Sequence, residues 1–389
     1  MSFKISPSNQ TPLAVGVALA IALFATDAGT IAAQPQPQGM IQHVNCVGGQ
    51  SLADAVRHSR EGQTIHVSGI CHERVTITTS RLTLSGGGTA VIDGAGVAMG
   101  ADPEFDGLVV INGVTGVTLT GLTIQNSSAN GVLAQRGAAF TMHDVVVQDN
   151  AVTGIVVVDH SSAELTDTAT IRNRLGLDVV TSSSAVIKGA FASNQNTENG
   201  VDINGSAVVE LRGAQVELNQ NAGYGLVASS GSRVAIFGWQ ASHGSTLTAD
   251  SNGFAGLIIA DASLTSYVPA QISASNNTFG LLLNDGRVVA PFGETKFLLE
   301  NNTVGMNLRN GSQVLIAGGL TVQSNGTGVL ADAAGPLTLT SVPANPSAIT
   351  GNVTDMRLQF GTRSTIEGVT IGTMVCDATV LSRGTKTCP

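Results

Sequence analysis

The chain contains 389 residues, carries a formal net charge of −9, and has only 12% charged and 4% aromatic residues. Its apolar content argues against an intrinsically disordered protein. Its acidity argues against binding to nucleic acid or to an anionic membrane, because either partner needs a basic face. The abundance of glycine and of small and β-branched residues instead predicts many strands joined by turns.

Residues 1–33 have the pattern of an export signal peptide. Lys4 supplies a positive charge, residues 13–25 are apolar, and small residues that suit cleavage follow. The apolar run is too short to span a bilayer, so we expect cleavage and no transmembrane segment afterwards; a retained anchor is the alternative. A proline-containing linker, residues 34–43, comes next. The sequence therefore predicts a secreted, periplasmic or cell-surface protein.

The four cysteines lie in two pairs, one near each end of the expected mature chain. In an exported protein we expect each pair to form a local disulfide, Cys46 with Cys71 and Cys376 with Cys388. The second disulfide would clip a C-terminal tail, residues 376–389. A metal site made by all four cysteines is the alternative, but the two pairs are separated by most of the chain.

A short helix is expected just after the first cysteine. Ser51 can cap it, with Asp54 three residues later, and Leu52, Ala55 and Val56 fall on one face. Ahead of a repeat array, such an amphipathic helix is typical of a cap that covers the apolar end of the first repeat.

From there on, the chain repeats a pattern of Asn, three residues, Gly and an apolar residue. Successive copies are 22 to 31 residues apart, most of them close to 24. A sustained period of this length predicts a repeat architecture. Clear copies begin at Asn150, Asn196, Asn221, Asn252, Asn276 and Asn301, and looser ones centre on Gly107, Gly131, Gly176, Gly328 and Asp355.

Each period has room for about three short strands separated by turns, as in residues 200–219. Stacking equivalent strands gives parallel sheets with about 4.8 Å between coils. The first and third residues after each Gly are apolar or small and should point into the core. The Asn side chains should bond to one another from coil to coil as a ladder.

These features resemble exported bacterial right-handed parallel β-helix proteins of the pectin-lyase-like superfamily. The resemblance rests on the cap with Cys46 and Cys71, the coil length and the Asn-x-x-x-Gly steps, and it covers about residues 44–375. It implies an all-β fold, a right-handed parallel β-helix of about 11 to 13 coils with three short strands per coil and a short N-terminal capping helix. It specifies the fold and leaves the activity open.

Catalytic segments of that superfamily are largely missing from the sequence. The Asn-Thr-Asp, Asp-Asp, Gly-His-Gly and Arg-Ile-Lys segments of polygalacturonases do not occur. Val157-Val158-Asp159-His160 resembles a pectate lyase segment but lacks its Trp, and an ordinary strand end is the simpler interpretation. The small number of Lys and Arg residues also disfavours polyuronate substrates. We therefore expect a non-catalytic protein.

Asp178 and Asp202 form the main candidate site. They lie two residues after Gly176 and Gly200, so stacking places their carboxylates on one outer face, about 5 Å apart. Repulsion would raise the pKa of one of them. The pair could bind a ligand, bind Ca²⁺ together with Asn204, or act as acid and nucleophile of a retaining glycosidase. Two solvated surface acids are the alternative.

The aromatic residues Tyr224, Trp239 and Tyr267 form a second candidate group. Trp239 lies in the longest period, together with His243, which has no evident metal partners. Because sugar rings stack on aromatic faces, we expect a glycan contact beside the acid pair. Ordinary loop packing is the alternative.

The other residues equivalent to Asp178 and Asp202 are apolar, and an exposed apolar stripe requires a covering. A loop, the linker or a second molecule could supply it, and we expect covering within the chain. These residues are Leu133, Val156, Val227, Ile258, Leu282 and Leu330.

The leading hypothesis is an exported, non-catalytic protein that binds polysaccharide or a cell-envelope partner along its side, with no cofactor except possible calcium. One alternative is a polysaccharide lyase or glycoside hydrolase with an atypical acidic site. Another is a structural or adhesive protein that self-associates through the apolar stripe.

Overall fold

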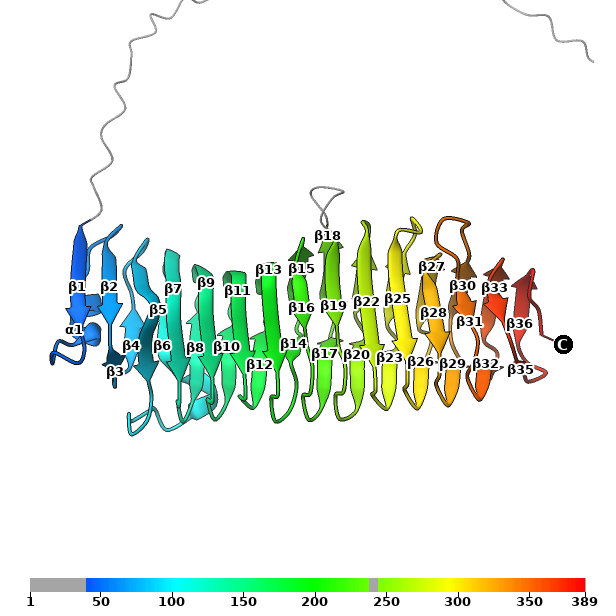
Figure 1. Ribbon diagram of the computed structural model, residues 1–389, viewed down its shortest axis with the longest axis horizontal. Helices are drawn as coiled ribbons and strands as arrows, with labels where there is room; N and C mark the ends of the chain where they lie inside the picture. Colours follow the sequence, from blue (N-terminus) through cyan, green and yellow to red (C-terminus); the bar gives the residue numbers. More distant parts are fainter. Residues whose placement is uncertain (1–39, 238–243, 389) are drawn as a thin grey trace, which may run out of the picture. The chain divides into compact units, whose positions relative to one another are not determined.

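The computed structural model describes residues 40–237 and 244–388. The predicted signal peptide, most of the predicted linker, Trp239 and His243 lie outside the described residues. Within them, the chain winds through successive coils whose equivalent strands pair in parallel (Figure 1). The solenoid has about 14 turns, slightly more than expected, because its first and last turns lack the Asn-x-x-x-Gly step.

One side of the coils forms a 13-stranded parallel sheet with one strand from each coil. Each strand follows the turn that contains the ladder Asn or its equivalent. The strands are β4 (Val75–Ile77), β6 (Gly107–Asn112), β8 (Asn130–Gln135), β10 (Thr153–Val157), β12 (Leu175–Val179), β14 (Val201–Ile203), β17 (Tyr224–Ser229), β20 (Ala255–Ala260), β23 (Phe279–Asn284), β26 (Val304–Arg309), β29 (Thr327–Asp332), β32 (Thr354–Gln359) and β35 (Met374–Cys376).

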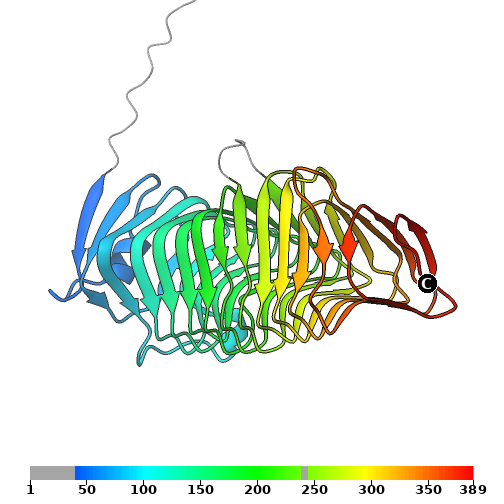
Figure 2. The same ribbon diagram turned by 45° about the vertical axis from the view of Figure 1, so that its right-hand side comes forward.

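The remaining strands form a 23-stranded sheet that wraps around the other sides of the coils (Figure 2). Its strands are β1 (Ile41–Asn45), β2 (Thr64–Ser68), β3 (Ile70–Cys71), β5 (Thr83–Asp93), β7 (Thr115–Gln125), β9 (Ala139–Gln148), β11 (Ser162–Ile171), β13 (Ser184–Asn194), β15 (Val208–Arg212), β16 (Gln215–Glu217), β18 (Arg233–Phe237), β19 (Ser245–Thr248), β21 (Ser263–Ser266), β22 (Ala270–Ser275), β24 (Arg287–Ala290), β25 (Thr295–Glu300), β27 (Gln313–Ala317), β28 (Leu320–Gln323), β30 (Pro336–Thr340), β31 (Ala348–Ile349), β33 (Arg363–Glu367), β34 (Thr370–Ile371) and β36 (Leu381–Gly384).

The prediction of three short strands per coil holds only for the later coils. From β5 to β13, one long bent strand of 10 or 11 residues replaces two short ones. A single residue with positive φ, such as Asp144 or Asp167, turns the corner without ending the strand. From β15 onward, longer connections separate the two halves. Pairing also reaches beyond residues 44–375, because β1 begins in the predicted linker and β36 lies in the predicted tail.

The core is the inward column that the sequence predicts. From Gly131 onward, the first and third residues after each repeat Gly, such as Leu257 and Ile259, are buried in it. The prediction was wrong by one residue at Gly107, where Val109 and Ile111 are the inward residues. Along the turn beside them runs the asparagine ladder. The Oδ1 atom of each ladder residue accepts the backbone N–H of the preceding one at 2.8–3.0 Å. Its members are Asn150, Asn173, Asn196, Asn221, Asn252, Asn277, Asn302, Asn325 and Asn352.

The predicted ladder was wrong by one residue in two coils. Asn277 and Asn302 form it, whereas Asn276 and Asn301 adopt left-handed conformations with φ of 59° and 56°. A residue with positive φ directly precedes every ladder Asn, and at most two residues separate it from the end of the preceding strand. Distance to the following Gly varies by one residue and is therefore a poorer guide.

Both ends of the solenoid are held as expected. In α1 (Leu52–Arg57), the Ser51 Oγ accepts the Asp54 N–H at 3.0 Å, and Leu52, Ala55 and Val56 are buried. The two disulfides join Cys46 to Cys71 and Cys376 to Cys388, as predicted. Of the helices in the described ranges, none is long and apolar enough to cross a membrane.

Replacing one ladder residue should destabilise the whole stack. Asn221 accepts two hydrogen bonds from Asn196, and its Nδ2 donates to the Ser193 carbonyl oxygen and to Asn252. Asn221→Ala leaves buried polar groups without partners, so the free energy of unfolding should fall by about 3 kcal/mol. Urea unfolding measures this loss.

Gln323→Ala is the control, because the exposed Gln323 amide bonds only to Glu300. It should change the free energy of unfolding by about 0.5 kcal/mol or less. Equal losses in both variants would show that the ladder contributes no more than a surface amide.

Candidate functional site

The outer column is the row of outward-facing residues at the middle of the 13-stranded sheet. Strand register confirms that its members are equivalent, with Asp178 of β12 directly opposite Asp202 of β14. From β6 to β32, in chain order, the outer column comprises Val110, Leu133, Val156, Asp178, Asp202, Val227, Ile258, Leu282, Asn307, Leu330 and Arg357.

The first part of the outer column is buried within the chain. Val110, Leu133 and Val156 are only 2%, 2% and 7% exposed. The connection from β5 to β6, which contains the 3-10 helix η1 (Pro103–Phe105), packs against β8. Asn130 of β8 holds this connection in place, because its Nδ2 donates to three of its carbonyl oxygens. The connection therefore forms a wall beside the acid pair.

The acid pair occupies the next two positions of the column. Burial, together with the negative charge of Asp202, raises the pKa of Asp178 to about 7. Burial also raises the pKa of Asp202 to about 6, although hydrogen bonds from the Asn199 Nδ2 at 3.1 and 3.3 Å oppose this rise. In the described part of the chain, the buried Oδ1 of Asp178 has no hydrogen-bond partner. Near neutral pH, one carboxyl therefore keeps a proton more readily than the other.

Arg174 connects the acid pair to the wall. Its guanidinium lies 2.8 Å from Glu104 of η1 and 3.2 Å from Glu198. Its positive charge lowers the pKa of both Asp178 and Asp202, but less than burial raises them. Arg174 is thus a single cation that acts on four carboxyl groups, those of Asp178, Asp202, Glu104 and Glu198. This excess of negative charge favours a proton, a cation or a hydroxyl-rich ligand at the pair.

Calcium at the acid pair stays a prediction. Asn204 follows β14, but among the described contacts its side chain bonds to neither carboxylate. In the same ranges, the one group of three metal-type ligand atoms at short spacing is Cys46, Cys71 and Glu73, and both sulfurs are in the disulfide. Ca²⁺ needs six to eight oxygen ligands, of which the pair supplies only part.

An aromatic cluster lies next to the acid pair. Tyr224, at the start of β17, contacts Phe254 edge-on with ring centroids 5.5 Å apart, and Phe254 contacts Phe279 at 5.1 Å. Asn199 links the two groups, because its Oδ1 accepts the Tyr224 N–H at 3.1 Å while its Nδ2 bonds to Asp202. The structure thus brings Tyr224 to the predicted site.

Sequence reasoning missed Phe254, Phe279 and Arg309. The Arg309 guanidinium lies 5.7 Å from the centre of the Phe279 ring, and its Nε donates to the outer-column residue Asn307 at 3.3 Å. A signal was available: Tyr224, Phe254 and Phe279 all lie one or two residues before the repeat Gly of three successive coils.

Tyr267 belongs to a different face. It follows β21 in the 23-stranded sheet and lies between Phe237 and Phe292, with ring centroids 6.4 and 6.2 Å away. The expected grouping with Tyr224 therefore does not form. Tyr224 begins a strand of the 13-stranded sheet, whereas Tyr267 follows a strand of the 23-stranded sheet. Asp159 and His160 form an exposed left-handed turn after β10, with φ of 55° and 60°.

The stacked coils are those of a parallel β-helix protein, and its candidate site lies on the outer face of the 13-stranded sheet. Residues 63–241 match the family model described as "Right handed beta helix region". The A-module of a mannuronan C-5 epimerase from Azotobacter vinelandii is 15% identical, with a TM-score of 0.54, over 82% of this chain and 93% of that chain. The alginate lyase of Paenibacillus sp. strain FPU-7 is 12% identical, with a TM-score of 0.51, over 68% of this chain and 97% of that chain. No curated protein sequence matches the chain.

At these identities the two solved structures establish the fold alone. Together with the family model, they confirm the predicted right-handed parallel β-helix fold. The role of the acid pair has to come from its own geometry.

The acid pair should make stability depend on pH. Because the pKa of Asp178 rises from 3.8 to about 7 on folding, the folded state holds a proton that the unfolded state has already lost. The free energy of unfolding should therefore fall as pH rises from about 4 to about 7 and level off above that window. Asp178→Asn should weaken this fall and exceed the wild type in stability by about 2 kcal/mol at pH 8.

Urea unfolding at several pH values tests this expectation. Asp202→Asn should show a smaller effect of the same sign, and the double variant should gain less than the sum, because each substitution removes the repulsion felt by the other. An unchanged pH dependence in all three variants would contradict the assignment.

Proposed function

We propose that the protein is exported and binds a polysaccharide on the outer face of the 13-stranded sheet, at the acid pair and the aromatic cluster of Tyr224, Phe254 and Phe279. The observation that carries the proposal is the contact between these two groups through Asn199. Sugar rings stack their apolar faces on aromatic rings, while carboxylates accept hydrogen bonds from sugar hydroxyls. Such a combination of aromatic and acidic side chains suits an uncharged glycan.

The arrangement of the face favours a chain rather than a single sugar. Equivalent positions recur about every 4.8 Å along the stack, close to the length of a sugar unit. The wall at η1 closes the face on one side of the acid pair. On the other side, Val227 and Ile258 remain partly exposed beside the aromatic cluster. A bound glycan would therefore run from the acid pair across β17, β20 and β23.

Two further observations support the proposal. Both similar structures carry the names of proteins that act on polysaccharides, a mannuronan epimerase and an alginate lyase. The two disulfides suit an oxidising, extracellular environment. Assembly through the outer column has less support, because Val110, Leu133 and Val156 are already buried within the chain.

Removing the aromatic rings should weaken glycan binding. Tyr224→Ala and Phe254→Ala each lose a stacking surface, so affinity for the bound polysaccharide should fall about 10-fold or more. Titration calorimetry against a panel of neutral and acidic polysaccharides measures the loss. Phe292→Ala is the matched control, because Phe292 is 66% exposed in the turn between β24 and β25, away from the 13-stranded sheet, and should leave affinity unchanged.

Absence of binding to every polysaccharide of a broad panel would overturn the proposal. An equal loss in Phe292→Ala would move the binding face to the 23-stranded sheet.

Glycoside hydrolysis is the second candidate function, favoured by the acid pair itself. Its two pKa values, about 7 and about 6, allow one carboxyl to donate a proton while the other is ionised. Retaining glycosidases place these two groups about 5 Å apart, which matches the spacing of neighbouring parallel strands. Asp178, with the higher pKa, would act as the acid and Asp202 as the nucleophile.

Product analysis separates binding from hydrolysis. The binding proposal predicts no new reducing ends and no unsaturated products from any polysaccharide. If reducing ends appear near pH 6 to 7, Asp178→Asn/Asp202→Asn should abolish them, while Asp332→Asn, elsewhere on the same sheet, should retain them. That outcome would replace the binding proposal by hydrolysis. Products that survive the double variant would exclude the acid pair as the catalytic groups.

A further inference from the structure

The cations of this chain are divided into two groups. In the first half, most of the arginines and the one described lysine form ion pairs with carboxylates. These are Arg57, Arg74, Arg81, Arg172, Arg174, Lys188 and Arg212. After Arg212, no lysine or arginine within residues 213–237 and 244–388 forms an ion pair. The described cations of the later coils are therefore not held by carboxylates in ion pairs, although acidic residues are present in the same coils.

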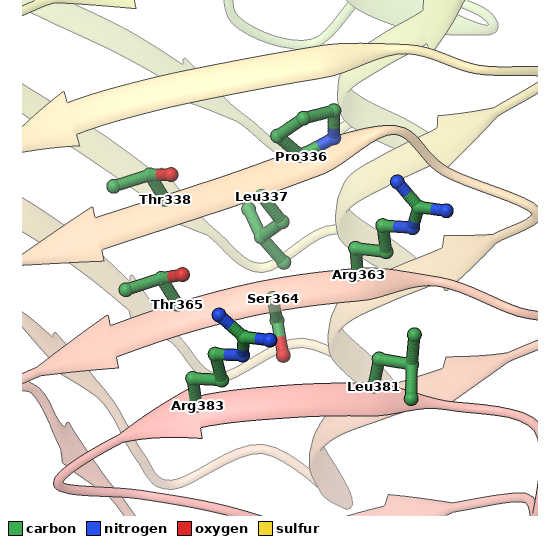
Figure 3. A pocket seen from close by; sticks show the side chains of 8 residues that line it. All are labelled: Pro336, Leu337, Thr338, Arg363, Ser364, Thr365, Leu381 and Arg383. Carbon is green, nitrogen blue, oxygen red and sulfur yellow. The ribbon is translucent and has the colours of Figure 1, made fainter. Parts of the chain in front are cut away.

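Two of these unpaired cations lie together on the outer face of the 23-stranded sheet. Arg363 begins β33, and Arg383 lies on the adjacent strand β36, opposite Thr365. Neighbouring strands are about 4.8 Å apart and the register offset is two residues, so their Cα atoms are about 8 Å apart. Both side chains project over the same face, together with Thr338 and Thr365 (Figure 3). They border a hollow of about 320 Å³, which Pro336 and Leu381 also line.

The last strand, β36, places Arg383 at this hollow. The strand itself buries almost no apolar surface. Leu381 is 61% exposed, and most of β36 faces solvent. The ladder to β33 holds it, as does the Cys376–Cys388 disulfide, whose Cys388 N–H donates to the Ser382 Oγ at 2.7 Å. Gly384 has a φ of 104°, and a Cβ there would collide with the Ile366 carbonyl oxygen. Backbone pairing and the disulfide, rather than hydrophobic packing, hold this strand, and they bring Arg383 beside Arg363.

We propose that Arg363 and Arg383 form a binding site for an oxyanion, a carboxylate, sulfate or phosphate group. A guanidinium presents N–H donors in a planar fork that matches two oxygens of such a group. Thr338 and Thr365 offer hydroxyl donors beside the two forks. Glu367, at the other end of β33, also lies on this face, but it forms no ion pair with either arginine among the described contacts. The two guanidinium groups repel one another, and a bound anion reduces that repulsion.

The oxyanion has two chemical sources, a free inorganic ion or a charged group of an acidic polysaccharide. A free ion would contact the arginine pair alone. A polysaccharide chain along the stack would also reach Arg287 of β24, which occupies the same first outward position as Arg363 three strands earlier. Neutralising Arg287 therefore distinguishes the two sources.

Titration calorimetry at low ionic strength tests the site with inorganic sulfate, inorganic phosphate and dextran sulfate, and with uncharged dextran as the neutral polymer. We expect at least one of the anions to bind and dextran not to bind at this site. Arg363→Gln/Arg383→Gln should reduce anion affinity at least 10-fold. The control Arg172→Gln/Arg212→Gln, which removes the same charge from two ion-paired positions, should change it less than 2-fold.

Two more variants sharpen the result. Arg363→Lys/Arg383→Lys keeps the charge but loses the fork, so affinity should lie between that of the wild type and that of the glutamine variant. Arg287→Gln should weaken dextran sulfate and leave inorganic sulfate unchanged if the source is a polymer, and should affect neither if the source is a free ion. Thermal unfolding of each variant shows whether the fold is retained.

Either of two results would overturn the proposal: no binding of any anion to the wild type, or an equal loss in the Arg363/Arg383 and Arg172/Arg212 glutamine variants. The second would mean that net charge, rather than this pair, governs binding.

Discussion

The stack depends on the asparagine ladder, because the ladder fixes how one coil lies on the next. Each turn leaves backbone N–H groups that no strand can accept, and a buried N–H without a partner is costly. The Oδ1 of the following coil's Asn accepts one of them in eight successive steps. With the turns in register, the strands of the 13-stranded sheet are also in register, and their outward side chains fall on columns. The candidate sites are consequences of that alignment.

The sequence predicts what repeats and misses what departs from the repeat. Alignment of Asp178 with Asp202 follows from counting residues after each Gly, because equivalent residues of stacked coils must coincide. The predicted ladder position at Asn276 was wrong, because the left-handed residue directly before the ladder Asn, rather than the distance to the Gly, marks it. The wall over Leu133 could not be predicted either, since the path of the β5–β6 connection depends on contacts such as that of Asn130 with η1. Arg309 was missed for the same reason, because it reaches back across a coil to Phe279.

The net charge does not show how the ion pairs are distributed along the chain, and this distribution matters for binding. A total of −9 argues against an anionic partner, and the low number of cations was an argument against charged glycans. The structure changes the weight of that argument. Most cations up to Arg212 form ion pairs with carboxylates of the same or an adjacent strand or turn, whereas the described cations after it form none. Local fields act over about 10 Å at ordinary salt, so each face responds to its own charges rather than to the total.

The acid pair and the arginine pair are both like-charged pairs that coil stacking creates, and they differ in how the repulsion is relieved. Asp178 and Asp202 can take up a proton, as their raised pKa values of about 7 and 6 indicate, so the acid pair can exist without a ligand. An arginine keeps its charge at any physiological pH, so Arg363 and Arg383 have no such route. Solvent screening reduces the repulsion between Arg363 and Arg383 only in part, and a bound oxyanion reduces it further. The acid pair should therefore respond to pH, and the arginine pair to the anions around it.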